Sequence, residues 1–212
     1  MTVALYASCG DKKEHDVGVM LRNTLLSAFL AIGEPEKVVF RTGNGRPFLS
    51  VPACDLSISH SHGVAACALS FPGNMPLPVF PLGDAILIDA DEEAFQIGLD
   101  IETVEGKKRE MAERVSRRNF SAGELEAFTG ANDDEAFLDR FLEIWTKKES
   151  LIKNTGVGLA GFRKADTAAL PTGFSLVTHK VTDFEKPFFL SAALKKRSDN
   201  EILTFDDRSD IP

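Results

Sequence analysis

The sequence predicts an α+β fold built from two similar α+β halves. A strand and a helix followed by further strands occur in that order twice along the chain. A length of 212 residues and a hydrophobic content of 43% are enough to bury a core in one large domain or two small ones. The halves should meet near residues 85–100, so we place the first at residues 1–96 and the second at residues 97–212.

The first half begins with an amphipathic helix. Residues 16–32 carry apolar side chains at helical spacing, and Gly33-Glu34-Pro35 ends the helix. A short strand over 37–41 follows. The turn-forming residues of 42–47 then predict a loop.

The rest of the first half alternates between apolar runs and segments that resist regular structure. Residues 56–69 suit strands that enter a core, but the segment 57–63 within them is too polar for a core strand. Four prolines make 71–81 a loop, and a short apolar run follows at 85–88. The whole stretch from about 71 to 96 therefore resembles an insertion.

The second half contains the strongest helix pattern of the sequence. Apolar side chains recur at helical spacing over 133–154, and the helix ends at Gly156. Ser121 and Glu124 are spaced as a capping box at the start of another helix. The other expected elements are a strand over 94–102, a helix over 106–118, two antiparallel strands over 173–181 and 188–194, and a frayed polar tail from Ser198.

Charge and cysteine content argue against several classes of protein. The chain has 24 Lys and Arg against 32 Asp and Glu, and its net charge of −8 disfavours binding to nucleic acid or an anionic membrane. The longest apolar run, 64–69, is far short of the roughly 20 residues that a membrane span needs. Cys9, Cys54 and Cys67 are an odd set without C-x-x-C spacing, which argues against a disulfide framework or a zinc site and fits a cytoplasmic protein.

Asp100 and Glu102 are the first candidate functional residues. They lie two positions apart on the expected strand, so both carboxylates point to one face, opposite its apolar side chains. Two carboxylates this close favour a cation between or beside them, and Mg²⁺ with substrate phosphates is the natural choice. The alternative is a solvated outer face of an edge strand.

Glu149 is unusual because it falls within the apolar stripe of its helix. At about 100° per residue it lies about 20° from Leu138, near the centre of that stripe. A carboxylate that points inward needs a partner, and Lys153 stands one turn later. Glu149 is therefore either half of a structural salt bridge with Lys153 or a third metal-binding carboxylate, with Lys153 facing a phosphate.

Two further segments carry polar or basic side chains. Ser59-His60-Ser61 lacks the G-x-S-x-G setting of a serine hydrolase, and together with Arg46 it is better suited to bind an anion. The turn at 43–45 has no Walker-loop spacing. The other segment is either a solvated helix face or a docking surface for an acidic partner, and it contains Lys107, Lys108, Arg109, Arg114, Arg117 and Arg118.

Taken together, these residues resemble the 4′-phosphopantetheinyl transferase family, which acts on acyl and peptidyl carrier proteins. The resemblance runs from about residue 17 to residue 159 and is closest to the larger, pseudo-dimeric type. Its most specific part is W-x-x-K-E-x-x-x-K at a set distance after G-x-D-x-E. The matching blocks are Gly45-Arg46-Pro47 with Ile58-Ser59-His60-Ser61, Ile97 to Glu102, Phe120-Ser121 with Glu124, Trp145 to Lys153, and Gly156 to Leu159.

The resemblance implies a fold with two α+β halves in a pseudo-two-fold arrangement and the active site between them. Asp100, Glu102 and Glu149 would hold Mg²⁺ against the diphosphate of coenzyme A, and Lys153 would meet the diphosphate near the bond that breaks. Glu149 is also the best candidate to accept the proton of the attacking hydroxyl, since a carboxylate in a semi-apolar setting can have a raised pKa.

The first half would bind the nucleotide end of coenzyme A, and the second half would hold the metal and the carrier protein. Arg46, Ser59 and His60 would contact the nucleotide, including its 3′-phosphate. The acidic carrier would dock on the basic segment of residues 107–118. We expect a monomer.

The expected activity is Mg²⁺-dependent transfer of the 4′-phosphopantetheine arm from coenzyme A to a serine of an apo carrier protein, with release of adenosine 3′,5′-bisphosphate. Two alternatives stay open at this point. One is a catalytically silent protein of the same fold that binds coenzyme A or a nucleotide. The other is a metal-dependent phosphohydrolase, in which water replaces the carrier serine.

Overall fold

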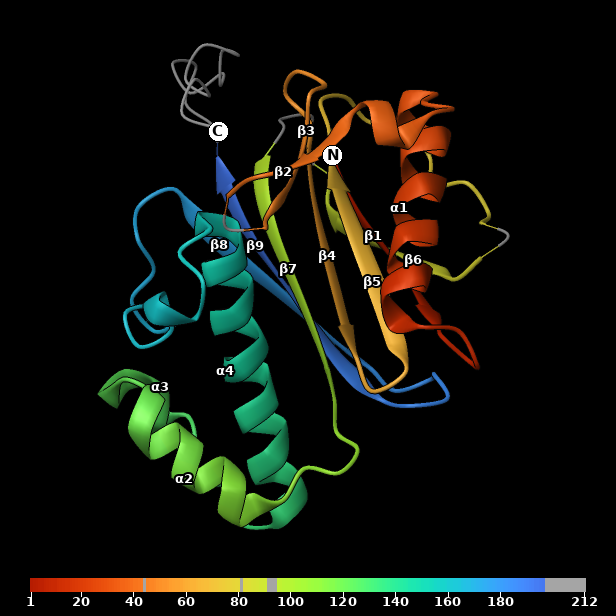
Figure 1. Cartoon of the computed structure of the whole chain (residues 1–212). Coiled ribbons are helices and arrows are strands. Elements are labelled where there is room, and N and C mark those ends of the chain that lie inside the picture. The colour runs from red at the N-terminus through yellow and green to blue at the C-terminus, as the bar shows by residue number, and fades with distance from the viewer. Residues whose placement is uncertain (44, 81, 91–94, 197–212) are drawn as a thin grey trace.

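The computed structural model of the chain has a mixed α+β fold (Figure 1). It describes residues 1–43, 45–80, 82–90 and 95–196. The tail from Ser198 lies outside the described residues. In chain order the elements are β1 (Thr2–Ser8), α1 (Glu14–Leu30), η1 (Pro35–Lys37), β2 (Val39–Arg41), β3 (Pro47–Leu49), β4 (Asp55–Ser61), β5 (Val64–Ser70), β6 (Asp84–Asp89), β7 (Phe95–Thr103), α2 (Arg109–Asn119), α3 (Ala122–Glu126), α4 (Asp134–Thr155), η2 (Leu159–Gly161), β8 (Phe174–Val181) and β9 (Phe188–Lys196).

The first unit is an antiparallel sheet covered on one face by α1. Its strand order is β4-β5-β1-β6. The apolar stripe of α1, which includes Val17, Leu21 and Leu25, packs on alternate residues of β1 and β5, such as Leu5 and Cys67. The helix expected over 16–32 is thus confirmed with bounds two residues earlier.

The second unit is built on a three-stranded antiparallel sheet in the order β7-β9-β8. Helix α4 lies across this second sheet, with α2 and α3 beyond it (Figure 1). The expected strands over 173–181 and 188–194 are confirmed, as is the long helix before Gly156. The strand expected over 94–102 is confirmed from residue 95 on, since residue 94 lies outside the described residues.

The two sheets face each other between the two helical layers. The face of β1 and β5 that α1 does not cover packs on β7 and β9, and alanines on the first sheet allow a close approach. Ala66 and Ala68 meet the larger Leu99 and Leu190 in this core cluster. At the near edges, β4 and β7 run side by side (Figure 1).

Strand β4 corrects the expectation that residues 57–63 are too polar for a core strand. Ser57, Ser59 and Ser61 are all buried, and their side chains point to β7. Backbone N–H groups of β7 bind two of these hydroxyls: Leu99 N–H donates to Ser57 Oγ at 2.9 Å and Ile101 N–H to Ser59 Oγ at 3.3 Å. The prediction was wrong because a second edge strand satisfies the hydroxyls, so the polar side chains do not need water.

Part of the stretch from 71 to 96 is built into the first sheet. Strand β6 covers the apolar run expected at 85–88 and pairs with β1 at the sheet edge. The residues described between Phe71 and β6 form no helix or strand, as the four prolines predict. Among the described residues, no helix is long and apolar enough to cross a membrane.

Candidate functional site

Strand β7 carries its two carboxylates on the face that α4 covers. Asp100 is buried there, so the alternative of a solvated edge-strand face is wrong for this residue. The helix lies directly on the strand at Gly98, where a Cβ atom would come within 2.1 Å of the Ser150 carbonyl oxygen. Glycine in the G-x-D-x-E block thus lets the helix that carries Glu149 approach the strand that carries Asp100.

The Asp100 carboxylate is held on one side only. Its Oδ1 accepts a hydrogen bond from Lys153 Nζ at 2.7 Å and another from Ser59 Oγ at 3.0 Å. Its Oδ2 is buried and has no hydrogen-bond partner in the described part of the chain. Burial raises the pKa of Asp100, against the opposing effect of the Lys153 charge. The Asp100 carboxylate therefore keeps one buried oxygen atom whose hydrogen-bonding capacity is not used within the described residues.

Glu102 lies two residues further along the same face and has its own pair of partners. Ser61 Oγ donates to its Oε2 at 2.8 Å, and Lys107 Nζ donates to the same oxygen at 3.1 Å. The other carboxylate oxygen has no such contact among those described. Strand β4 therefore supplies one serine to each carboxylate of β7.

Glu149 lies on α4 and faces a pocket as a half-buried side chain. In the described residues its carboxylate forms no ion pair with Lys153, whose ion pair is with Asp100 instead. The alternative of a structural Glu149–Lys153 salt bridge is therefore wrong. Burial and the negative charge of Asp100 raise the pKa of Glu149 to about 7.

Asp100, Glu102 and Glu149 offer carboxylate oxygens, which are the ligands that Mg²⁺ prefers, but the three side chains are not gathered around one point. Among the described residues, no group of three Asp, Glu, His or Cys side chains lies within metal-binding separation. The donors nevertheless fit a hard divalent cation: Asp100 offers a buried oxygen without a partner, and Glu149 has its pKa raised partly by Asp100 and Glu102. A cation would relieve this repulsion.

A pocket of about 390 Å³ lies where the two units meet. Arg46, His60, Glu149 and Lys153, all singled out from the sequence, line it. Asp100 and Glu102 do not line it, but Asp100 pairs with Lys153, which does. The turn after α4, with Gly156 at φ 70°, closes one end of the pocket.

His60 and Ser59 have different surroundings although they are neighbours. His60 Nδ1 lies 2.9 Å from the Glu14 carboxylate at the start of α1, and the ring remains partly exposed in the pocket. Ser59 is buried: its hydroxyl donates to Asp100 and accepts from Lys153 Nζ at 2.8 Å and from the Ile101 N–H. The hydrogen-bonding capacity of Ser59 is thus used within the protein.

A buried ion pair beside the site was missed by the sequence analysis. Lys148 Nζ donates to both oxygens of Glu124, at 3.1 and 2.9 Å, and to the Ala165 carbonyl oxygen. Glu124 also completes the expected capping box with Ser121 and binds the Thr167 N–H at 2.7 Å. The capping pattern predicted the local bond of Glu124, but no local signal indicated its partner 24 residues away.

The basic segment of residues 107–118 is partly occupied by internal ion pairs. Lys107 pairs with Glu102, Arg109 pairs with Glu113 and Asp134, and Arg117 pairs with Glu113. Within the described residues, the other three basic side chains form no ion pair: Lys108, Arg114 and Arg118. These three are the part of the segment that is available to a partner.

Comparisons with known proteins point to one family. The model of the 4′-phosphopantetheinyl transferase superfamily matches residues 96–205. The chain is 28% identical over 158 residues to the L-aminoadipate-semialdehyde dehydrogenase-phosphopantetheinyl transferase of Xenopus laevis, covering 70% of this chain and 45% of that protein. It is also 28% identical over 156 residues to the 4′-phosphopantetheinyl transferase psf-1 of Bacillus pumilus, covering 72% of this chain and 54% of that protein.

The chain spans about half the length of these curated relatives. The family match includes the strand with Asp100 and Glu102 and the helix with Glu149 and Lys153. It covers more than half of the sequence. The chain belongs to the 4′-phosphopantetheinyl transferase superfamily.

Proposed function

We propose that the protein transfers the 4′-phosphopantetheine arm of coenzyme A to a serine of an apo acyl or peptidyl carrier protein, with Mg²⁺ as cofactor. The serine oxygen forms a bond to the β-phosphorus, and the bond from that phosphorus to the bridging diphosphate oxygen breaks. Adenosine 3′,5′-bisphosphate leaves, and the serine proton passes to a base on the enzyme.

The observation that carries this proposal is the convergence of Lys153 and Glu149 on one pocket beside the half-satisfied Asp100. Phosphoryl transfer asks a protein mainly for positioning and for neutralisation of phosphate charge. A lysine, a carboxylate with a raised pKa and an unpaired buried oxygen meet those needs. The two relatives named above are both described as phosphopantetheinyl transferases.

Lys153 is placed to neutralise the diphosphate. Its side chain is 33% exposed and lines the pocket, and its ammonium group donates hydrogen bonds to Asp100 and Ser59. One ammonium proton is then left for a phosphate oxygen. Asp100, Glu102 and Glu149 would hold Mg²⁺, which supplies further neutralisation of the diphosphate charge.

Glu149 is our candidate for the base. In the metal-free protein burial raises the pKa of Glu149 to about 7, so its carboxylate is a stronger base there than an ordinary glutamate. It also lines the pocket, so an incoming hydroxyl group can approach it. We place the proton on its carboxylate, directly or through one water molecule.

The remaining parts of the proposal concern the ends of the site. His60, in the pocket and partly exposed, would contact the nucleotide, and Ser59 would assist by holding Lys153 in place. Lys108, Arg114 and Arg118 on or beside α2 would receive the acidic carrier protein. We also propose that the enzyme is a monomer, since one chain supplies both walls of the pocket. We propose a cytoplasmic location.

The test is to incubate the protein with coenzyme A, Mg²⁺ and a panel of apo carrier proteins, and to follow each carrier by intact mass. Addition of one phosphopantetheine arm, abolished in Asp100→Ala and Glu149→Ala proteins that remain folded, is the expected result. No modification of any carrier overturns the proposal. Thermal stabilisation by coenzyme A without turnover would then indicate a silent binding protein, and release of the bisphosphate without a carrier would indicate a hydrolase.

A further inference from the structure

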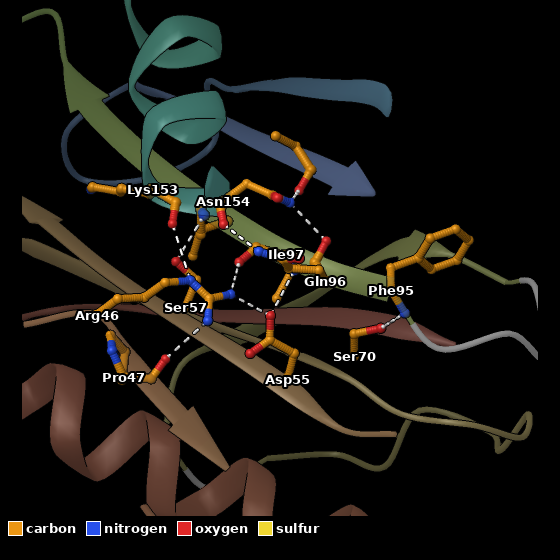
Figure 2. A network of polar contacts seen from close by, with 12 residues as sticks. Arg46, Pro47, Asp55, Ser57, Ser70, Phe95, Gln96, Ile97, Lys153 and Asn154 are labelled. Carbon is orange, nitrogen blue, oxygen red and sulfur yellow. Dashed lines mark hydrogen bonds and ion pairs between the residues drawn. The ribbon is translucent and has the colours of Figure 1, made fainter. Parts of the chain in front are cut away.

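Arg46 lines the pocket, but its guanidinium group is turned toward the protein (Figure 2). Its Nε donates to the Lys153 carbonyl oxygen at 3.2 Å, and its Nη2 donates to the Ile97 carbonyl oxygen at 3.2 Å. Nη2 also pairs with the Asp55 carboxylate at 2.5 Å. The Arg46 side chain is 17% exposed and that of Asp55 only 2%. A further contact joins Nη1 to the Pro47 carbonyl oxygen at 3.5 Å.

Apart from the adjacent Pro47, the acceptors of this one arginine belong to three elements. Asp55 begins β4 of the first unit, Ile97 lies on β7 of the second, and Lys153 lies in the last turn of α4. Asp55 adds a second link, because its Oδ2 also accepts the Ile97 N–H at 2.9 Å. Arg46 therefore joins both units and the end of the helix at one point.

The neighbouring bonds fix the same turn of α4 to the second sheet. Asn154 Nδ2 donates to the Gln96 carbonyl oxygen at 2.7 Å and to the Ala193 carbonyl oxygen at 2.8 Å. Gln96 Nε2 donates back to the Asn154 carbonyl oxygen at 2.6 Å. Figure 2 shows these amide bonds beside the Arg46 contacts. The carbonyl groups of a last helical turn lack partners within the helix, and here side chains from other elements supply them.

Fixing the Lys153 backbone sets the point from which its side chain reaches the site. The Lys153 ammonium reaches Asp100 Oδ1 and Ser59 Oγ from that turn, and Glu149 lies one turn earlier on the same helix. The positive charge of Arg46 at this helix end is favourable as well. A shift of the turn by about 1 Å is of the size that lowers a reaction rate by about 100-fold.

We propose that Arg46 is a positioning residue, which acts on the reaction by fixing Lys153 and Glu149 rather than by binding the nucleotide. Its contacts leave a single N–H, on Nη1, without a partner among those described. The inference rests on the proposed transferase activity. It departs from the expectation that Arg46 is mainly a nucleotide ligand.

The first test separates positioning from binding. We would measure kcat for carrier modification and the Kd of coenzyme A by calorimetry for Arg46→Ala, Arg46→Lys and the wild type. Positioning predicts a kcat lower by about 100-fold in Arg46→Ala, a Kd that changes by less than about threefold, and no rescue by lysine, which lacks the planar fork that spans these acceptors. A raised Kd with unchanged kcat, or full rescue by lysine, overturns the proposal.

A second measurement does not need activity. Lysines are labelled by reductive ¹³C-methylation, and the Lys153 signal is assigned from its loss in Lys153→Arg. We expect this signal to shift in Arg46→Ala and to stay in place in Arg163→Ala, whose side chain is exposed and contacts only Asn119 among the described residues. An unmoved Lys153 signal in folded Arg46→Ala refutes the inference, even if no carrier is ever modified.

Arg46→Ala removes the cation that pairs with the buried Asp55 carboxylate. This variant is therefore the one most at risk of unfolding. The double variant Arg46→Ala with Asp55→Asn removes that charge and keeps the side-chain volume. If Arg46→Ala does not fold, this double variant replaces it in both measurements. The same loss of kcat and the same shift of the Lys153 signal are expected in it, and their absence counts against the positioning role.

Discussion

Lys148 and Lys153 lie five positions apart on α4, and each pairs with a carboxylate from another element. Lys148 and its partner Glu124 are fully enclosed, with 0% of either side chain exposed. All three ammonium protons of Lys148 have acceptors. The Lys153 side chain is 33% exposed, and its ammonium group has two acceptors. In the described part of the chain, one carboxylate oxygen of its partner Asp100 accepts no hydrogen bond.

This difference separates a structural ion pair from a functional one. A network that satisfies every donor and acceptor holds the fold and has nothing left for a ligand. A network that leaves a proton and an oxygen unused next to a pocket can exchange its partners for a phosphate or a cation. Within the described chain, the number of hydrogen-bond donors and acceptors left without a partner distinguishes the two lysines better than their charge or their sequence motif does.

The largest effect is expected from breaking the enclosed pair. Lys148→Met leaves Glu124 buried without its cation, so the free energy of unfolding should fall by about 3–5 kcal/mol. Chemical denaturation measures the change. The matched control is Lys147→Met, which removes the more exposed i,i+4 pair with Glu143 and should lower the free energy of unfolding by about 1 kcal/mol or less. Equal effects of the two substitutions would contradict the structural role.

Lys153→Met should show the opposite profile. We expect carrier modification to slow by about 100-fold, because a preorganised positive charge beside the diphosphate is lost. The free energy of unfolding should fall by less than in Lys148→Met, since Lys153 is partly solvated. Activity assays and denaturation on the same preparations decide between the profiles. A fully active Lys153→Met protein would remove the basis for calling this pair functional.

The pKa of Glu149 gives a pH test in metal-free protein. Its folded pKa, about 7, is raised above its ordinary value of 4.5, so the folded state keeps a proton that the unfolded state releases between those values. The contribution of Glu149 to the free energy of unfolding is therefore fully present below pH 4.5 and is lost as the pH rises toward 7. We expect a slope of about 0.5–1 kcal/mol per pH unit, discounted for partial solvation.

Glu149→Gln should flatten that slope, and denaturation curves at several pH values measure it. Mg²⁺ should flatten it in the wild type as well, because a bound cation favours the ionised carboxylate. An identical slope in the wild type and in Glu149→Gln would show that another group is responsible.

The smallest effect is expected at the basic segment of residues 107–118. Basic side chains with and without an ion pair can be compared there at the protein surface. Replacing Lys108, Arg114 and Arg118 by Ala should raise the KM for an acidic carrier by a few-fold, more at low salt than at high salt. Replacing Arg117, which is paired with Glu113, should raise it less. Carrier titrations at two ionic strengths measure both. A KM that none of these changes alters would place the docking surface elsewhere.

Local patterns predicted what depends on near neighbours. The spacing of apolar residues over 133–154 predicted α4, and Ser121 with Glu124 predicted a capping box that the structure contains. The alternation along β7 placed Asp100 and Glu102 on one face. These features depend on residues a few positions apart, and such residues are adjacent in any helix or strand.

Contacts between distant segments were not predictable in this way. Ser57 and Ser59 are buried because β7, about 40 residues later, binds their hydroxyls. Lys148 lies about 80° from the centre of the apolar stripe of its helix, yet it is enclosed because α3 and the segment near Ala165 cover it. Polar burial depends on where a partner lies in space, which the periodicity of one helix or strand does not contain.

The seam between β4 and β7 has a further consequence, for solubility. Both are edge strands of their sheets, and an uncovered edge offers unpaired N–H and C=O groups to strands of other molecules. Here side chains of Asp55, Ser57 and Ser59 occupy the outward N–H groups of β7. These short polar residues thus protect a sheet edge, and Ser59 among them also accepts a hydrogen bond from Lys153, so its loss would expose the chain to aggregation as well as to inactivation.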